Sequence, residues 1–205
     1  MALVLGTNCG FVTSAPTDDP SGDATVNMDT MCNAQKDTSP ATAAKVTEIG
    51  WWSNNATEES NFEVGLYSDA GAGEPELRLQ VDDTNAKGTT AGWKKVTVNW
   101  TISPSTIYWL AVQLDDTSTN TVIDRANAGG TDAYAQLNAQ TSLPSDWGSS
   151  YYKNATRLFA IYAVWQAASP PPAPEVDNYP VQIGSPQLRK QDTLSQRAWI
   201  KGVPR

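Results

Sequence analysis

Residues 95–102 read Lys-Val-Thr-Val-Asn-Trp-Thr-Ile and give the clearest structural signal in this chain of 205 residues. Every second residue is apolar, from Val96 to Ile102, and the residues between them are polar. Because successive side chains of a β-strand point to opposite sides, this alternation predicts a strand with one buried face and one solvated face.

Strand signals recur before and after this segment. Strong signals lie at residues 46–52, at 61–67 with Phe62, Val64 and Leu66 on one face, and at 77–81 with Leu77, Leu79 and Val81 on one face. Weaker signals lie at residues 121–125 and 133–137. Turn-like segments rich in Gly, Pro, Asp and Asn separate them, and no segment has the period of an amphipathic helix. Short strands at this spacing predict an all-β fold, an antiparallel β-sandwich that is jelly-roll-like.

Two runs, residues 107–114 and 158–165, are apolar on both faces. Such runs indicate central strands that are covered on both sides, or strands with one face against another subunit. Residues 1–45 show little period, and we expect them to form loops with short strands near residues 3–5 and 25–28.

The composition changes near Trp165, which divides the chain into a sandwich body at residues 1–166 and an extended arm at residues 167–205. The arm holds seven of the thirteen prolines, and the run at 170–174 favours an extended polyproline conformation. The body has a net charge of −10 and the arm one of +2. An acidic body with a stiff, basic arm favours assembly onto a partner over catalysis.

Three motifs of the body resemble a widespread sandwich module. They are Leu-Tyr-Ser-Asp at 66–69, Gly-Trp at 92–93 and Tyr-Trp-Leu-Ala-Val at 108–112. The module is similar to this chain from about residue 46 to 165, and it occurs in bacterial secreted proteins and in predicted phage structural proteins. Leu-Gly-Thr-Asn at 5–8, without a preceding signal peptide, looks more like the phage members. The resemblance implies a jelly-roll-like fold, and its motifs are packing motifs that carry no chemistry.

The composition also argues against several functions. The chain has no histidine, which removes the commonest general base and transition-metal ligand, and we expect no enzymatic activity. The net charge of −8 disfavours nucleic-acid binding. No run of 18 apolar residues and no secretory signal is present, so we expect no membrane partner.

Cofactors and disulfides are not indicated either. Acidic pairs at 18–19, 58–59, 82–83 and 115–116 supply the oxygen ligands that calcium prefers, but their spacing matches no calcium loop. We therefore expect acidic turns in solvent and no cofactor. Cys9 and Cys32 could form a disulfide if oxidised, but two cysteines are no disulfide framework, and packed free thiols are the expectation.

Four aromatic residues are candidates for a glycan platform, Trp51, Trp52, Tyr151 and Tyr152. Neighbours in a strand face opposite ways, so we expect one tryptophan of the first pair inside and the other outside. An exposed Trp beside a Tyr would stack on sugar rings. The alternative is that these rings fill the core or seal a contact between subunits.

The arm carries the candidate partner-binding residues, because it has more apolar side chains than a linker needs. Residues 181–183 could add a strand to a sheet edge, and Trp199 between basic neighbours is suited to anchor an interface. The candidate set is Tyr179, Val181, Ile183, Leu188, Arg197, Trp199, Ile200 and Lys201.

These observations predict a virion structural protein of a bacteriophage. It would be a capsid decoration, cement or fibre-like subunit, assembled in the host cytoplasm, that binds itself or other capsid or virion proteins through its arm. The alternative is a carbohydrate-binding module or receptor-binding domain that uses the Trp and Tyr platform.

Overall fold

The computed structural model describes residues 2–53, 62–85, 90–114, 121–127, 134–154 and 156–169. In this part of the chain all regular structure is β, with thirteen strands and no helix. No helix here is therefore long and apolar enough to cross a membrane. The predicted all-β class is confirmed.

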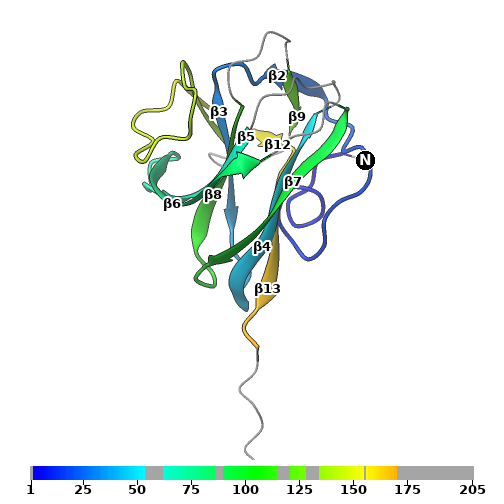
Figure 1. Cartoon of the computed structure of the whole chain (residues 1–205), viewed down its shortest axis with the longest axis vertical. Helices are drawn as coiled ribbons and strands as arrows, with labels where there is room; N and C mark the ends of the chain where they lie inside the picture. The colour runs from blue at the N-terminus through cyan, green and yellow to red at the C-terminus, as the bar shows by residue number, and fades with distance from the viewer. Residues whose placement is uncertain are drawn as a thin grey trace, which may run out of the picture. The chain divides into compact units, whose positions relative to one another are not determined.

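The strands form three sheets, which Figure 1 shows as two large layers with a small sheet at one end. The four-stranded sheet has the order β1 (Gly10–Val12), β13 (Ile161–Ala167), β4 (Ala43–Ser53) and β7 (Gly92–Thr101). The six-stranded sheet has the order β11 (Tyr152–Asn154), β10 (Tyr134–Leu137), β3 (Cys32–Thr38), β8 (Ile107–Leu114), β5 (Phe62–Asp69) and β6 (Pro75–Asn85). The small sheet has the order β12 (Arg157–Phe159), β9 (Val122–Asn127) and β2 (Ala24–Asn27).

The strand order is that of a jelly roll. Strands β4, β7 and β13 lie in one large sheet, while β3, β5, β6 and β8 lie in the other, so the chain passes repeatedly between the layers. The named strand pairs are antiparallel, except that β1 runs parallel to β13. The predicted antiparallel, jelly-roll-like sandwich is confirmed.

The main core lies between the two large sheets. Phe62, Val64 and Leu66 enter it from β5 and are at most 1% exposed, so the predicted inward face of that strand is correct. Trp100 and Ile102 are also buried there, as the alternation in residues 95–102 predicts. Apolar burial of this kind is the main stabilising contribution to the fold.

Segments of the same chain cover the outer face of each large sheet. Leu143 and Trp147 pack on Tyr67 and Trp109 outside the six-stranded sheet. On the four-stranded sheet a separate cluster joins Leu3, Cys9, Trp52 and Trp93 with residues near β12. The two-sided apolar run at 107–114 is therefore a central strand covered on both sides by its own chain, the first of the two predicted alternatives.

The run at 158–165 is not one strand, and that prediction is wrong. The chain bends at Ala160, so that β12 joins the small sheet and β13 joins the four-stranded sheet. The amide of Ala160 donates to the Asp124 carbonyl, and its carbonyl accepts from the Trp52 amide. The two-sided burial of this run thus comes from a strand switching between sheets, which apolar content cannot distinguish from a continuous strand.

Residues 1–45 contain more strand than predicted. The expected strand near 25–28 is present as β2, but residues 3–5 make only an isolated bridge between Leu5 and Cys9. The missed strand β3 is central in its sheet. Its inward residues include Asn33 and Gln35, both 0% exposed, so β3 lacks the apolar alternation that would reveal it.

Residues 77–81 form part of a strand as predicted, but two of their three apolar side chains remain exposed. Leu77 is 51% exposed and Leu79 is 46% exposed, while Val81 packs against the cluster around Trp109. Strand β6 is the edge strand of its sheet, and the isolated bridge of Leu77 to Asp146 pairs its backbone but does not cover the side chains of Leu77 and Leu79. The alternation correctly predicts a strand, but the position of that strand in the sheet decides which side chains it buries.

The boundary of the body lies close to the predicted one. The compact unit with all thirteen strands ends at Ser169, three residues past 166, and β13 itself ends at Ala167. From Pro170 onwards the predicted arm lies outside the described residues.

Candidate functional site

The predicted aromatic platform does not form as one surface. Trp51 is 0% exposed and packs edge-to-face on Phe62, with ring centroids 5.9 Å apart, so its assignment to a glycan platform is wrong. Trp52 points to the other side of β4, as the alternation of neighbours predicts. There it packs edge-to-face on Trp93 at 5.4 Å and is partly buried. Strand geometry thus places Trp51 in the core and Trp52 on the outer face, where its neighbours cover most of the ring.

The two tyrosines lie elsewhere. Tyr151 is 71% exposed and Tyr152 is 40% exposed, at the start of β11, which is the edge of the six-stranded sheet opposite β6. Trp52 belongs to the other large sheet. Of the four predicted residues, only Tyr151 and Tyr152 remain available as a surface pair.

Sequence reasoning missed two partners of Tyr152. Its ring stacks on Tyr134 with centroids 5.7 Å apart and an interplanar angle of 25°. The guanidinium of Arg157 lies 5.6 Å from the Tyr152 centroid and donates a 3.0 Å hydrogen bond to the Tyr134 hydroxyl. Burial raises the pKa of Tyr134 to about 12, while the positive charge of Arg157 acts in the opposite direction. These residues come from three strands, so no local motif could reveal them.

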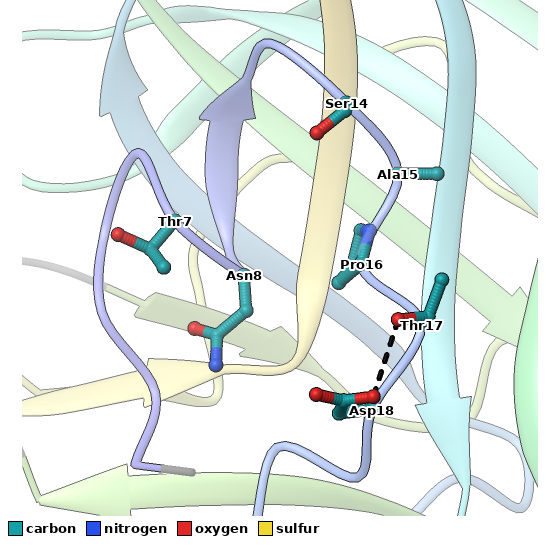
Figure 2. A pocket seen from close by; sticks show the side chains of 7 residues that line it. All are labelled: Thr7, Asn8, Ser14, Ala15, Pro16, Thr17 and Asp18. Carbon is teal, nitrogen blue, oxygen red and sulfur yellow. Dashed lines mark hydrogen bonds between the residues drawn. The ribbon is translucent and has the colours of Figure 1, made fainter.

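A small hollow lies beside the N-terminal segment (Figure 2). Its volume is about 170 Å³. The Asn8 side chain is occupied by the segment itself, because it accepts from the Val4 amide at 2.8 Å and donates to the Ala2 carbonyl at 3.1 Å. The Thr17 hydroxyl donates to the Asp18 carboxylate at 3.2 Å, the dashed line of Figure 2. The hydrogen bonds of its polar side chains thus hold the N-terminal segment and the loop in place. Its lining is Thr7, Asn8, Ser14, Ala15, Pro16, Thr17 and Asp18.

The acidic loop at 18–23 also serves the fold. The Asp19 carboxylate accepts from the Ser21 amide at 2.7 Å, and Asp23 accepts from the Asn127 amide at 2.8 Å. Among the described residues, no group of three or more acidic or cysteine side chains is placed to hold a metal ion. The pairs at 58–59 and 115–116 lie outside the described residues.

The buried titratable groups are poor candidates for catalysis. Cys9 and Cys32 are unpaired and fully buried in two different clusters, and burial raises the pKa of each thiol far above its ordinary value. A thiol attacks as its thiolate, so both groups are unreactive at neutral pH. Burial also raises the pKa of Asp37, whose carboxylate accepts from the amides of Phe11 and Thr38 and so fixes β1.

Two hollows flank the turn at residues 103–106. The first, of about 550 Å³, is lined mostly by small apolar residues and includes Ala167 and Ala168, which lie at the end of the compact unit. The second, of about 540 Å³, is lined by Leu79 and Ile107 together with Ser68 and Asp69. Sequence reasoning did not identify either surface, because each is made by segments far apart in the chain.

The candidate partner-binding residues of the arm lie outside the described residues, and their role stays a prediction. Comparison of the chain with known protein families, with curated proteins and with solved structures finds no match. The resemblance to the sandwich module of bacterial and phage proteins therefore also stays a prediction.

Proposed function

We propose that this chain is a structural subunit of a bacteriophage virion, a decoration, cement or fibre-like protein without enzymatic activity that assembles through its C-terminal arm. The observation that carries the proposal is a sandwich that completes its own core before the arm begins. All thirteen strands lie between Gly10 and Ala167, and chain segments cover the outer faces of both large sheets.

The arm nevertheless contains large apolar side chains that favour burial. Tyr179, Val181, Ile183 and Trp199 lie in a segment too rich in proline to build a core of its own. The arm is basic and the body acidic, with net charges of +2 and −10. Complementary charge of this kind speeds and orients association between subunits.

Trp199 tests the proposal, because Trp is among the residue types that dominate interface energies. We expect Trp199→Ala to weaken assembly by about 2 kcal/mol or more, an effect of about 30-fold. Neutralising Arg197 or Lys201 should weaken assembly less, and that loss should shrink as salt rises, since exposed charge pairs are screened.

The measurement is the dissociation constant of the self-association of the full chain, by sedimentation at low and high salt. The thermal midpoint of each variant serves as the folding control. Assembly of Trp199→Ala at wild-type strength would show that the end of the arm is a linker and not an anchor.

The virion assignment needs a separate test. Genes beside this one that encode a major capsid protein or portal would support it, and genes for glycoside hydrolases would oppose it. Co-expression with the neighbouring capsid protein should then give particles that retain the full chain through sedimentation. Capsid particles that lack this chain, recovered together with folded but unbound chain, would contradict the proposal.

A second candidate function, glycan or receptor binding, is favoured by one observation. Tyr151 is exposed beside Tyr152, which is stacked on Tyr134 and flanked by Arg157, so the pair presents a supported aromatic surface. Glycan-array binding that is lost in Tyr151→Ala and retained in Trp199→Ala would favour this function over assembly through the arm.

A further inference from the structure

An apolar strip crosses the edge of the six-stranded sheet. Leu77 and Leu79 of β6 are 51% and 46% exposed, and Ile107 at the start of β8 is 39% exposed. Leu79 and Ile107 line the same hollow. Leu77 lies two residues before Leu79 on the same strand, at a stretch where the register with β5 shifts. We define Leu77, Leu79 and Ile107 as the β6 strip.

The strip is unusual for this molecule, because other segments of the chain cover the apolar outer faces of both sheets. Exposed leucines on an edge strand, grouped with an exposed isoleucine at the end of a nearby strand, typically mark a contact surface. The strand order places β6 at the edge of the six-stranded sheet, separated from β8 by β5.

We propose that the β6 strip is the docking site for the arm segment 179–183 of a second copy of this chain. The inference rests on the proposed function, assembly through the arm, and adds the surface that receives it. The segment reads Tyr-Pro-Val-Gln-Ile, so its three large side chains recur at every second residue. In an extended chain they lie on one side, so they could contact the apolar side chains of the β6 strip together.

Charge supports the same partner. Strand β6 carries Glu76, Asp82 and Asp83, and its one basic side chain, Arg78, donates a hydrogen bond to the Leu143 carbonyl. Asp69 lines the hollow beside Leu79 and pairs with Lys36 at 3.6 Å. The segment 179–183 is itself uncharged, and the five basic side chains of the arm lie at residue 189 and beyond, so it is the arm's net charge of +2 that favours approach to the acidic body.

The length and stiffness of the arm favour a second copy over the same copy. Nine residues lie between Ser169 and Tyr179, and four of the first five are proline. At about 3.1 Å per residue, a polyproline segment of this length spans roughly 30 Å and acts as a semi-rigid spacer. A spacer of this reach is long enough for the segment that follows it to meet a neighbouring copy. Exchange of arms between identical subunits gives closed, symmetric assemblies.

The mode of docking is restricted by the sheet edge. The Arg78 amide donates to the Ser145 carbonyl, and the Trp147 amide donates to the Glu76 carbonyl, so this part of the β6 edge is already paired within the chain. The docked segment therefore contacts the strip mainly through side chains. Strand addition along the whole of β6 is not available.

The test uses two variants of the full chain and a mixture of them. The strip variant is Leu77→Ala with Leu79→Ala, and the arm variant is Val181→Asp with Ile183→Asp. Sedimentation velocity over about 1–100 μM should show self-association of the wild type, and we expect each variant to raise the dissociation constant at least about tenfold. Val4→Ala, at a residue 48% exposed on the N-terminal segment, is the matched control and should associate like wild type.

The mixture distinguishes direct docking from an indirect effect. The strip variant has an intact arm and the arm variant has an intact strip, so an equimolar mixture should form mixed dimers that neither variant forms alone. Circular dichroism and the thermal midpoint verify that both variants fold.

Three results would overturn the inference. In the first, the arm variant associates weakly while the strip variant associates like wild type. Assembly through the arm would then stand, but the arm would dock on a surface other than the β6 strip. In the second, both variants and Trp199→Ala associate as strongly as wild type. This result would also contradict the proposed self-assembly through the arm. A wild type that stays monomeric at about 100 μM would exclude a second copy as the occupant, and capsid co-expression would then test the proposed function alone.

Discussion

Strands β8 and β6 belong to the same sheet, and both carry large apolar side chains, in a continuous run on β8 and at alternate residues on β6, but they meet their surroundings differently. Residues of β8 are buried on both faces, by the main core on one side and by the cluster of Leu143 and Trp147 on the other. On β6, Leu77 and Leu79 remain exposed. The difference shows that a covering segment, and not the pattern of a strand, decides which apolar residues stay free for a partner.

The segment that covers β8, which includes Leu143 and Trp147 and is called the covering segment below, is held by specific contacts. Trp147 is 1% exposed, packs edge-to-face on Tyr67 at 5.1 Å and donates from its indole nitrogen to the Ser150 hydroxyl at 3.1 Å. The Tyr67 hydroxyl donates to the Pro144 carbonyl at 2.6 Å. These contacts make the segment an integral layer of the fold, which predicts that its removal costs far more than any change on the β6 strip.

The largest effect is expected for Trp147→Ala, which removes the central ring of the covering layer. The free energy of unfolding should fall by about 3–5 kcal/mol, because the substitution leaves a cavity between the segment and the sheet. Urea denaturation measures it. Tyr151→Ala is the control, because that ring is exposed four residues further along, and its effect should stay within about 0.5 kcal/mol. If both variants lowered the free energy of unfolding by the same amount, the proposed difference between covered and exposed surfaces would be wrong.

Gly65→Ala tests how closely the covering segment packs. A Cβ atom at Gly65 would lie 2.9 Å from Cδ1 of Leu143 and 3.2 Å from the Gln80 carbonyl oxygen of β6. We expect a loss of about 1–3 kcal/mol in the free energy of unfolding from overpacking. In a double-mutant cycle, Leu143→Ala should relieve part of that loss, since it removes the nearest atom. Strict additivity of the two substitutions would show that the segment is not pressed against the sheet at this point.

The comparison also explains what sequence reasoning could and could not predict. The alternation at Phe62, Val64 and Leu66 specified both the strand and its buried face, because β5 lies inside the sheet. The same reading at Leu77 and Leu79 specified the strand but not its exposure, since edge position depends on the order of strands. Strand β3 escaped notice because Asn33 and Gln35 satisfy their polar groups inside the core, to Gln136 and to the Phe159 amide.

The candidate surfaces were harder to predict than the fold. Alternation correctly placed Trp51 and Trp52 on opposite sides of one strand, but it could not show that Trp93 covers Trp52. The stack of Tyr134, Tyr152 and Arg157 depends on strand register, and the β6 strip depends on a hollow shared with Ile107. Pairings between distant segments leave no local trace in a single sequence.

Tyr67→Phe should have a smaller effect, which depends on pH. Loss of the hydroxyl leaves the Pro144 carbonyl without this partner and should cost about 1 kcal/mol at neutral pH. Burial raises the pKa of Tyr67 above its ordinary value of about 10, so the hydroxyl stays protonated in the folded state while it ionises in the unfolded state. The wild type should therefore lose stability as the pH rises above about 10.

Tyr67→Phe should not show this pH-dependent loss of stability at residue 67, because phenylalanine does not ionise. The difference in unfolding free energy between Tyr67→Phe and wild type should shrink between pH 9 and pH 11, measured by urea denaturation at each pH, in line with the raised pKa. Tyr162, whose pKa burial also raises, is present in both proteins and cancels in the comparison. A difference that stays constant over this range would show that Tyr67 is not shielded by the covering segment.

The smallest effect on stability is expected at the β6 strip. Leu77→Ala and Leu79→Ala remove side chains that are about half exposed in the isolated subunit, so each should change the free energy of unfolding by no more than about 0.5 kcal/mol under dilute conditions. If a second copy occupies the strip, the same substitutions should lower the thermal midpoint of concentrated protein more than that of dilute protein, because assembly stabilises the folded chain by mass action. Scanning calorimetry at two concentrations measures both quantities. A large loss at low concentration would mean that the leucines are covered within their own subunit, and the contrast between β6 and β8 would disappear.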